Sequence, residues 1–115
     1  MVYHYGDSFD GIVVSWKDAD DNPVSLSGYS AKLQARTTTG SGTLVLELTN
    51  AASNGLEINS SAGTVTINAS PSKMTSSPSA LVQGQGYFYD LQVTNGTETQ
   101  TLLKGELWVD GEVTT

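Results

Sequence analysis

Carboxylate and amide side chains recur at every second position in one short segment, a spacing that imitates the start of a calcium-binding loop. The segment reads Asp18-Ala19-Asp20-Asp21-Asn22-Pro23. A calcium loop of this kind also needs glycine at its sixth position and a bidentate carboxylate at its twelfth. This chain has Pro23 and Tyr29 at those positions. The segment therefore predicts a solvated hairpin turn, because Asp and Asn cap their own backbone and Pro23 ends strand pairing.

Few other side chains in this sequence could do chemistry. The chain has no cysteine and a single histidine, His4, three residues before Asp7. A base so near the terminus would be poorly held in a Ser-His-Asp triad, so we expect a surface histidine. Zinc disfavours an almost all-carboxylate site. Asp90 is the best-placed acid for glycoside chemistry, but the sequence indicates no second acid beside it. We expect no catalytic residue, no metal and no cofactor.

Exposed aromatic side chains form the candidate interface. Strand alternation places Phe88 and Trp108 on the outer faces of their strands, away from the apolar faces. Aromatic residues on an outer face are enriched in protein interfaces. The alternative is that both pack under a loop or against a second sheet. The apolar opening with Val2, Tyr3 and Tyr5 predicts an exposed edge strand that another chain can complete. The candidate interface is Phe88, Trp108, Val2, Tyr3 and Tyr5.

The strands that must position these residues are predicted by alternating apolar and polar side chains. The clearest strand is Gly86–Thr94, with Tyr87, Tyr89, Leu91 and Val93 on one face. Asn95-Gly96 follows it and predicts a type I′ hairpin turn, since both residues tolerate positive φ. We expect Gly86–Thr94 to be a central antiparallel strand, with residues 97–109 returning beside it.

The segment 9–16 has apolar residues on both faces. Ile12, Val14 and Trp16 share one side, with Phe9 and Val13 opposite. This pattern indicates a strand covered on both faces, or a strand whose outer face meets a partner. We favour the first interpretation.

About eight short strands and one short helix are predicted in total. Ser70 suits the N-cap of the helix and Pro71 its first position, and Pro78 ends it. The pattern predicts an all-β fold of one domain, residues 1–115. We expect a two-sheet antiparallel β-sandwich, immunoglobulin-like or jelly-roll-like, in preference to a small barrel. Its predicted core contains Ile12, Val14, Trp16, Leu33, Leu46, Val65, Tyr89, Leu91 and Leu107.

Composition limits the partners that we expect. Five Lys and Arg against twelve Asp and Glu give a net charge of −7. Nucleic acids and anionic membranes bind basic surfaces, so we expect neither as a partner. No apolar run follows Met1 and no segment approaches the length of a membrane span. We therefore expect a soluble protein without an export signal.

Several stretches together carry a resemblance to a known group of proteins. They are Gly6–Phe9 with Val14–Arg36, Gly63–Ile67, and Gly86–Val93 with Leu102–Val109. The chain resembles a widespread group of small tailed-bacteriophage proteins, and it is also similar to the N-terminal domain of phage baseplate upper proteins. It departs at Asp21, where the group has glycine. The turn remains feasible because Asp can adopt the left-handed conformation.

The resemblance implies a non-enzymatic β-sandwich in a phage virion, made in the host bacterial cytoplasm. It would bind other virion proteins, capsid or tail subunits, or further copies of itself. A head decoration or cement protein and a tail- or baseplate-associated adaptor both fit. The chain ends at Thr115 without a fibre or coiled-coil domain, which suits the head. A carbohydrate-binding module is the alternative, because β-sandwiches with exposed aromatic residues commonly stack on sugar rings.

Overall fold

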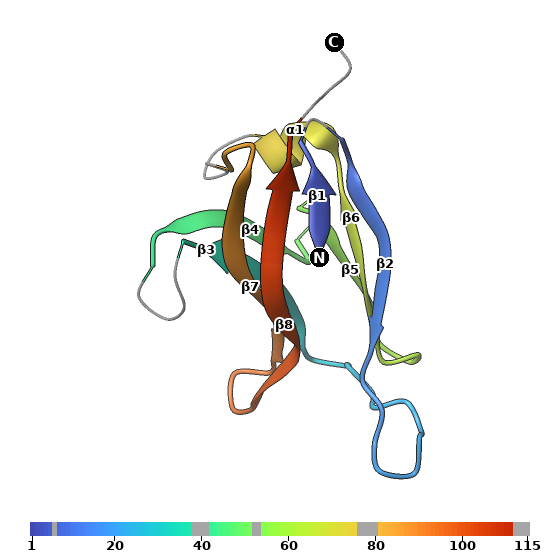
Figure 1. The fold of residues 1–115 in the computed structure, drawn as a ribbon. Coiled ribbons are helices and arrows are strands. Elements are labelled where there is room, and N and C mark those ends of the chain that lie inside the picture. Colours follow the sequence, from blue (N-terminus) through green and yellow to red (C-terminus); the bar gives the residue numbers. More distant parts are fainter. Residues whose placement is uncertain (6, 38–41, 52–53, 76–80, 112–115) are drawn as a thin grey trace.

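The computed structural model describes residues 1–5, 7–37, 42–51, 54–75 and 81–111. These residues form eight strands and one short helix, and the strands make two sheets that pack face to face (Figure 1). The two-sheet β-sandwich predicted from the sequence is confirmed. Within the described ranges, no helix is long and apolar enough to cross a membrane.

The larger sheet has five strands in the order β1-β8-β7-β3-β4. Their bounds are Val2–His4 (β1), Thr99–Asp110 (β8), Gln85–Thr94 (β7), Ser30–Arg36 (β3) and Leu44–Thr49 (β4). β7 lies at the centre, with β3 and β8 antiparallel on either side, as its alternation predicted. One pairing differs from the expected antiparallel sheet, because β1 runs parallel to β8. No hairpin joins these two strands, so no turn fixes their relative direction.

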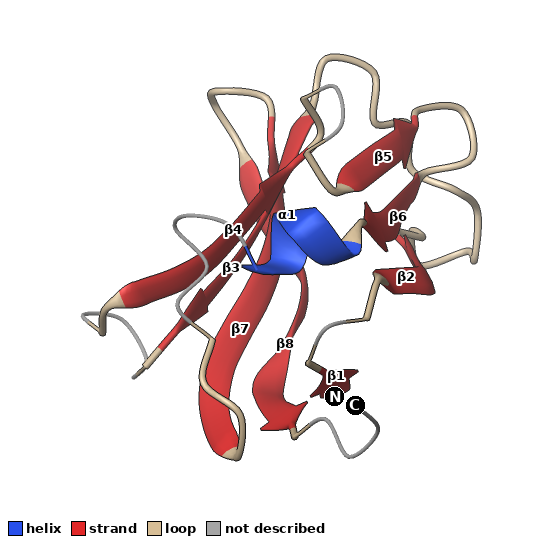
Figure 2. Cartoon of the chain, turned by 90° about the horizontal axis from the view of Figure 1, so that it is seen from above, coloured by secondary structure: helices blue, strands red, loops and turns tan. Residues whose placement is uncertain are grey.

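The smaller sheet has three antiparallel strands in the order β2-β6-β5. Their bounds are Phe9–Ser15 (β2), Thr64–Ala69 (β6) and Leu56–Asn59 (β5). The helix α1, Pro71–Thr75, lies across one end of the space between the sheets, as Figure 2 shows. The amide of Lys73 donates to Ser70 Oγ at 3.3 Å, which confirms the predicted N-cap. The predicted stop at Pro78 lies outside the described residues.

The core between the sheets contains most of the residues predicted for it. Leu33, Leu46, Val65, Tyr89, Leu91 and Leu107 are buried. Ile12, Val14 and Trp16 are only half-buried, although they pack against the core. The difference arises because β2 is an edge strand of the smaller sheet, where few neighbours cover its side chains.

The hairpin between β7 and β8 forms as predicted, but its turn is not the predicted type I′ turn. Thr94 pairs with Thr99, so the connection is the four-residue loop 95–98. Gly96 has φ +91°, but Asn95 does not have the positive φ that a type I′ turn requires. The Asn95 side chain explains the longer loop, since its Oδ1 accepts from the amides of Thr97 at 3.0 Å and Glu98 at 2.7 Å. These bonds form an Asx turn.

β2 departs from the prediction in two ways. A bulge lies between Asp10 and Ile12, where Gly11 has φ +80°. The extra residue reverses the alternation, so Phe9 is buried on the same side as Ile12. Val13 is 58% exposed, so the expectation of a strand covered on both faces is wrong. The alternative, an outer face that meets a partner, stays a prediction.

Candidate functional site

The segment that imitates a calcium loop uses its first carboxylate within its own turn. Asp18 Oδ1 accepts from the amides of Asp20 at 2.9 Å and Asn22 at 3.0 Å. Lys17 and Pro23 form an isolated bridge across the turn. Asp21 has φ +64°, which confirms the prediction that Asp21 can adopt the left-handed conformation in this turn. The predicted hairpin turn is confirmed.

The other candidate chemical groups lie apart from one another. His4 is exposed, as predicted, and its Nδ1 lies 3.3 Å from Asp110 Oδ2 at the ends of β1 and β8. Asp90 lies farther along the larger sheet, between Gln34 on β3 and Lys104 on β8. Among the residues that the structure describes, no three His, Cys, Asp or Glu side chains gather as a metal site would require.

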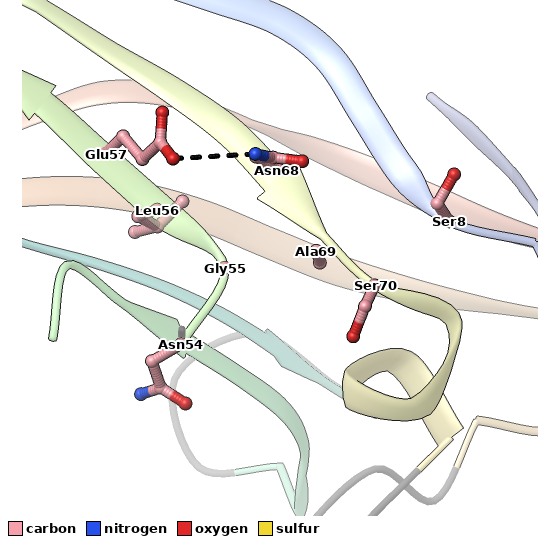
Figure 3. Close-up of a pocket in the computed structure, with 8 residues that line it drawn as sticks. All are labelled: Ser8, Asn54, Gly55, Leu56, Glu57, Asn68, Ala69 and Ser70. Carbon is pink, nitrogen blue, oxygen red and sulfur yellow. Dashed lines mark hydrogen bonds between the residues drawn. The ribbon is translucent and has the colours of Figure 1, made fainter. Parts of the chain in front are cut away.

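A pocket of about 440 Å³ lies where β5 begins and β6 leads into α1 (Figure 3). Ser8, Asn54, Glu57, Asn68 and Ser70 contribute polar side chains to its lining. Asn68 Nδ2 donates to Glu57 Oε1 at 3.5 Å. Glu57 is the only carboxylate of the described lining, so the pocket lacks the pair of acids that glycoside hydrolysis uses. Sequence reasoning missed this pocket because its residues come from three separate segments without a motif.

Three of the five predicted interface residues gather on the outer face of the larger sheet. Val2, Phe88 and Trp108, here called the outer-face cluster, are 52%, 38% and 47% exposed. Val2 pairs with Trp108 across β1 and β8, and Trp108 pairs with Gly86 on β7. Phe88 follows Gly86 by two residues and therefore shares its face. The sequence prediction that Phe88 and Trp108 face outward is confirmed.

Gly86 allows the Trp108 ring to lie close to the sheet. A Cβ atom added at Gly86 would lie 3.5 Å from Trp108 Cε3 and 4.0 Å from Cζ3. The indole ring therefore lies within ordinary contact distance of a Cβ atom at position 86, over the backbone of β7. Glu106 on β8 and Arg36 on β3 flank Phe88, so charges of both signs border the outer-face cluster.

The two remaining interface candidates face inward. Tyr3 is only 1% exposed, because the parallel register places it beside the buried Val109. Its ring meets Phe9 edge-on at 5.7 Å, and its hydroxyl donates to the Asp7 carbonyl at 2.8 Å. Tyr5 is half-buried against the core. Tyr3 thus offers no side-chain surface to a partner, and β1 contributes mainly through Val2.

Tyr29 and Tyr89 are two titratable groups with perturbed pKa values. Burial raises the pKa of Tyr89 above its ordinary 10.0. Desolvation, followed by the Glu98 carboxylate, raises the pKa of Tyr29. The Tyr29 hydroxyl donates to Glu98 Oε2 at 3.3 Å. Both shifts favour the neutral phenol, so neither tyrosine is activated as a phenolate nucleophile.

Comparison with known proteins finds no family model that matches the chain and no curated protein that is similar to it. The resemblance to phage proteins therefore stays a prediction. The fold and the site define a two-sheet β-sandwich with an exposed aromatic cluster on its larger sheet.

Proposed function

We propose that this protein is a non-enzymatic structural protein of a tailed-phage virion that binds other virion subunits through its outer-face cluster. The observation that carries the proposal is the exposure of Val2, Phe88 and Trp108 side by side on one sheet face. A few residues carry most of the binding energy of a protein interface, and tryptophan is enriched among them. The resemblance of the chain to phage proteins supports the class of partner.

The proposal includes two roles in the virion. One is a head decoration or cement protein, and the other is a tail- or baseplate-associated adaptor. Each requires contact with a neighbouring subunit and neither requires catalysis. The net charge of −7 would oppose non-specific association of free copies and favour a less acidic or basic surface on the partner.

Substitution of Trp108 by alanine tests the proposal. The ring is about half buried, so its loss should cost about 1–3 kcal/mol of stability and leave the domain folded. Particles produced with the Trp108→Ala protein should contain at least about tenfold fewer copies, measured by quantitative mass spectrometry of purified virions.

Thr101→Ala is the matched control, because Thr101 is exposed on the same strand and pairs with the outward-facing Gln92. It should incorporate normally. Normal incorporation of folded Trp108→Ala would show that other surfaces make the contact. Absence of the wild-type protein from virions would overturn the structural role itself.

A carbohydrate-binding module is the second candidate, and the position of Trp108 favours it. The ring lies close against β7 at Gly86 and remains half exposed, an arrangement that offers a surface on which a sugar ring can stack. A glycan array with wild-type and Trp108→Ala proteins separates the candidates. Glycan binding that disappears with Trp108→Ala would support the carbohydrate-binding module.

A further inference from the structure

The free edge of β2 is a second surface that the outer-face cluster does not explain. β2 is the end strand of the smaller sheet and pairs only with β6 (Figure 1). An edge strand with unpaired amides and carbonyls is a template for another strand.

The hydrogen bonds of β2 show which of its backbone groups face this edge. The amide of Trp16 donates to the carbonyl of Gly63, which leads into β6, at 2.9 Å. Antiparallel pairing alternates, so Val14 and Ile12 also direct their backbone groups toward β6. On β6, the amide of Asn68 donates to the Gly55 carbonyl on the opposite side, which agrees with this alternation. The backbone groups of Val13 and Ser15 therefore face outward.

The side chains of β2 do not protect its edge. Natural edge strands avoid association through charged residues, proline, bulges or very short length. The stretch from Gly11 to Trp16 contains no ionisable residue and no proline, and Val13 is 58% exposed. β2 has seven residues, and its bulge at Gly11 lies near one end, before the apolar stretch.

The other sheet edges are each protected. β1 has three residues, and β5 has four and contains Glu57. β4 contains Glu47, has an irregular register opposite Arg36, and already uses the Thr49 amide in a bond to Asn54. Among the described strands, β2 therefore offers the longest uncharged edge.

We propose that two copies of this chain associate through antiparallel pairing of their β2 edges about a twofold axis. An isologous interface brings each residue opposite its symmetry mate, so the strand must complement itself. Centred on Val13, this pairing places Val13 opposite Val13 of the second copy and joins their outward amides and carbonyls. Gly11 then stands opposite Ser15, and the charged Asp10 stands opposite Trp16. No like charges meet, and the two three-stranded sheets become one sheet of six strands.

The overall charge gives this dimer a specific salt dependence. Each copy carries −7, so two copies repel one another at long range, whereas residues 11–15 at the centre of the paired edges carry no charge. Added salt screens the repulsion but has little effect on backbone pairing and apolar contact. The dimer should therefore become tighter as ionic strength rises. An association held together by ion pairs would weaken.

Val13→Lys tests the inference on the purified full-length protein. It places two ammonium groups opposite one another at the centre of the interface, although it makes the net charge of each copy less negative. Weaker association thus cannot come from long-range repulsion. Val82→Lys is the matched control, because Val82 is 54% exposed, precedes β7 of the other sheet and makes the same charge change.

Sedimentation equilibrium from about 1 μM to about 1 mM should show a monomer–dimer equilibrium for the wild-type protein and for Val82→Lys. Val13→Lys should raise the dissociation constant at least about tenfold while remaining folded by circular dichroism. Amide exchange adds a second measurement. The Val13 and Ser15 amides should gain protection as concentration rises, whereas the Val14 amide should be protected throughout.

A wild-type protein that stays monomeric over this range overturns the proposal, as does a dimer that Val13→Lys leaves unchanged. A dimer that weakens with Trp108→Ala instead would lie on the outer-face cluster. These measurements need no virion, so their outcome is independent of the test of the proposed function.

Discussion

Gly63 should be the least replaceable glycine of the described chain, and Gly63→Ala tests how the turn 17–23 is held to the smaller sheet. Gly63 has φ +66°, and an added Cβ would lie 2.5 Å from the Val24 carbonyl oxygen. That separation is well inside the 3.4 Å at which ordinary contact begins. The Trp16 carbonyl oxygen and the Val24 amide nitrogen would each lie 3.1 Å away. All these atoms belong to the backbone, so no side-chain rotation can relieve the clash.

The magnitude follows from two contributions. A left-handed backbone costs an alanine about 1–2 kcal/mol relative to glycine. Relief of the clash must also disturb two hydrogen bonds, from the Trp16 amide to Gly63 and from the Val24 amide to Trp16, each 2.9 Å long. Each such bond contributes about 0.5–1.5 kcal/mol. Gly63→Ala should therefore destabilise the protein by about 2–5 kcal/mol.

Gly28→Ala is the matched control for this measurement. Gly28 has φ +82° but no atom within 4 Å of an added Cβ, so only the backbone contribution of about 1–2 kcal/mol applies. The lower entropy of the unfolded chain with alanine affects both variants alike and cancels in their difference. Urea unfolding followed by tryptophan fluorescence gives both free energies. Equal losses for the two variants would refute the steric argument.

Two further predictions concern the core and the tyrosine hydroxyls. Leu91 is fully buried on the central strand, so Leu91→Ala should cost about 2–5 kcal/mol in urea unfolding, and a loss below about 0.5 kcal/mol would contradict the packing described. The pKa of Tyr29 is raised in the folded state, so the stability linked to it is complete below pH 10.0 and is lost as pH rises through the folded pKa. Glu98→Gln should lower the Tyr29 pKa in an ultraviolet absorbance titration, with Tyr29→Phe identifying the signal; an unchanged pKa would show that Glu98 has no influence.

Alternation alone predicted the larger sheet well because its strands have one buried and one open face. The register places Tyr87, Tyr89 and Leu91 inward, where the period of two had placed them. The sequence predictions were wrong where a single residue interrupts the alternation of a strand or selects a different turn. The bulge at Gly11 reversed the side of Phe9, and the Asn95 side chain selected a longer loop than Asn-Gly alone indicates.

The candidate site was predictable only in part. Outward positions for Phe88 and Trp108 follow from strand periodicity, which is local information. The inward position of Tyr3 depends on the parallel pairing of β1 with β8, which joins the two ends of the sequence and leaves no local signal. The open edge of β2 was also not predictable from local sequence, since only the order of strands in the sheet decides which strand lies at its edge.

The two proposed contacts lie on different sheets, and this separation gives them a joint consequence. The outer-face cluster belongs to the five-stranded sheet, whereas the β2 edge belongs to the three-stranded sheet. One copy could therefore use both contacts at once, and a β2-paired dimer would carry two clusters. A cluster of three apolar side chains is a small contact and binds weakly by itself. A virion repeats the same subunit many times, so the second cluster of a dimer would bind at high effective concentration once the first is engaged. Dimerisation would then convert a weak single contact into stable attachment, provided that the spacing of the two clusters matches the spacing of the subunits.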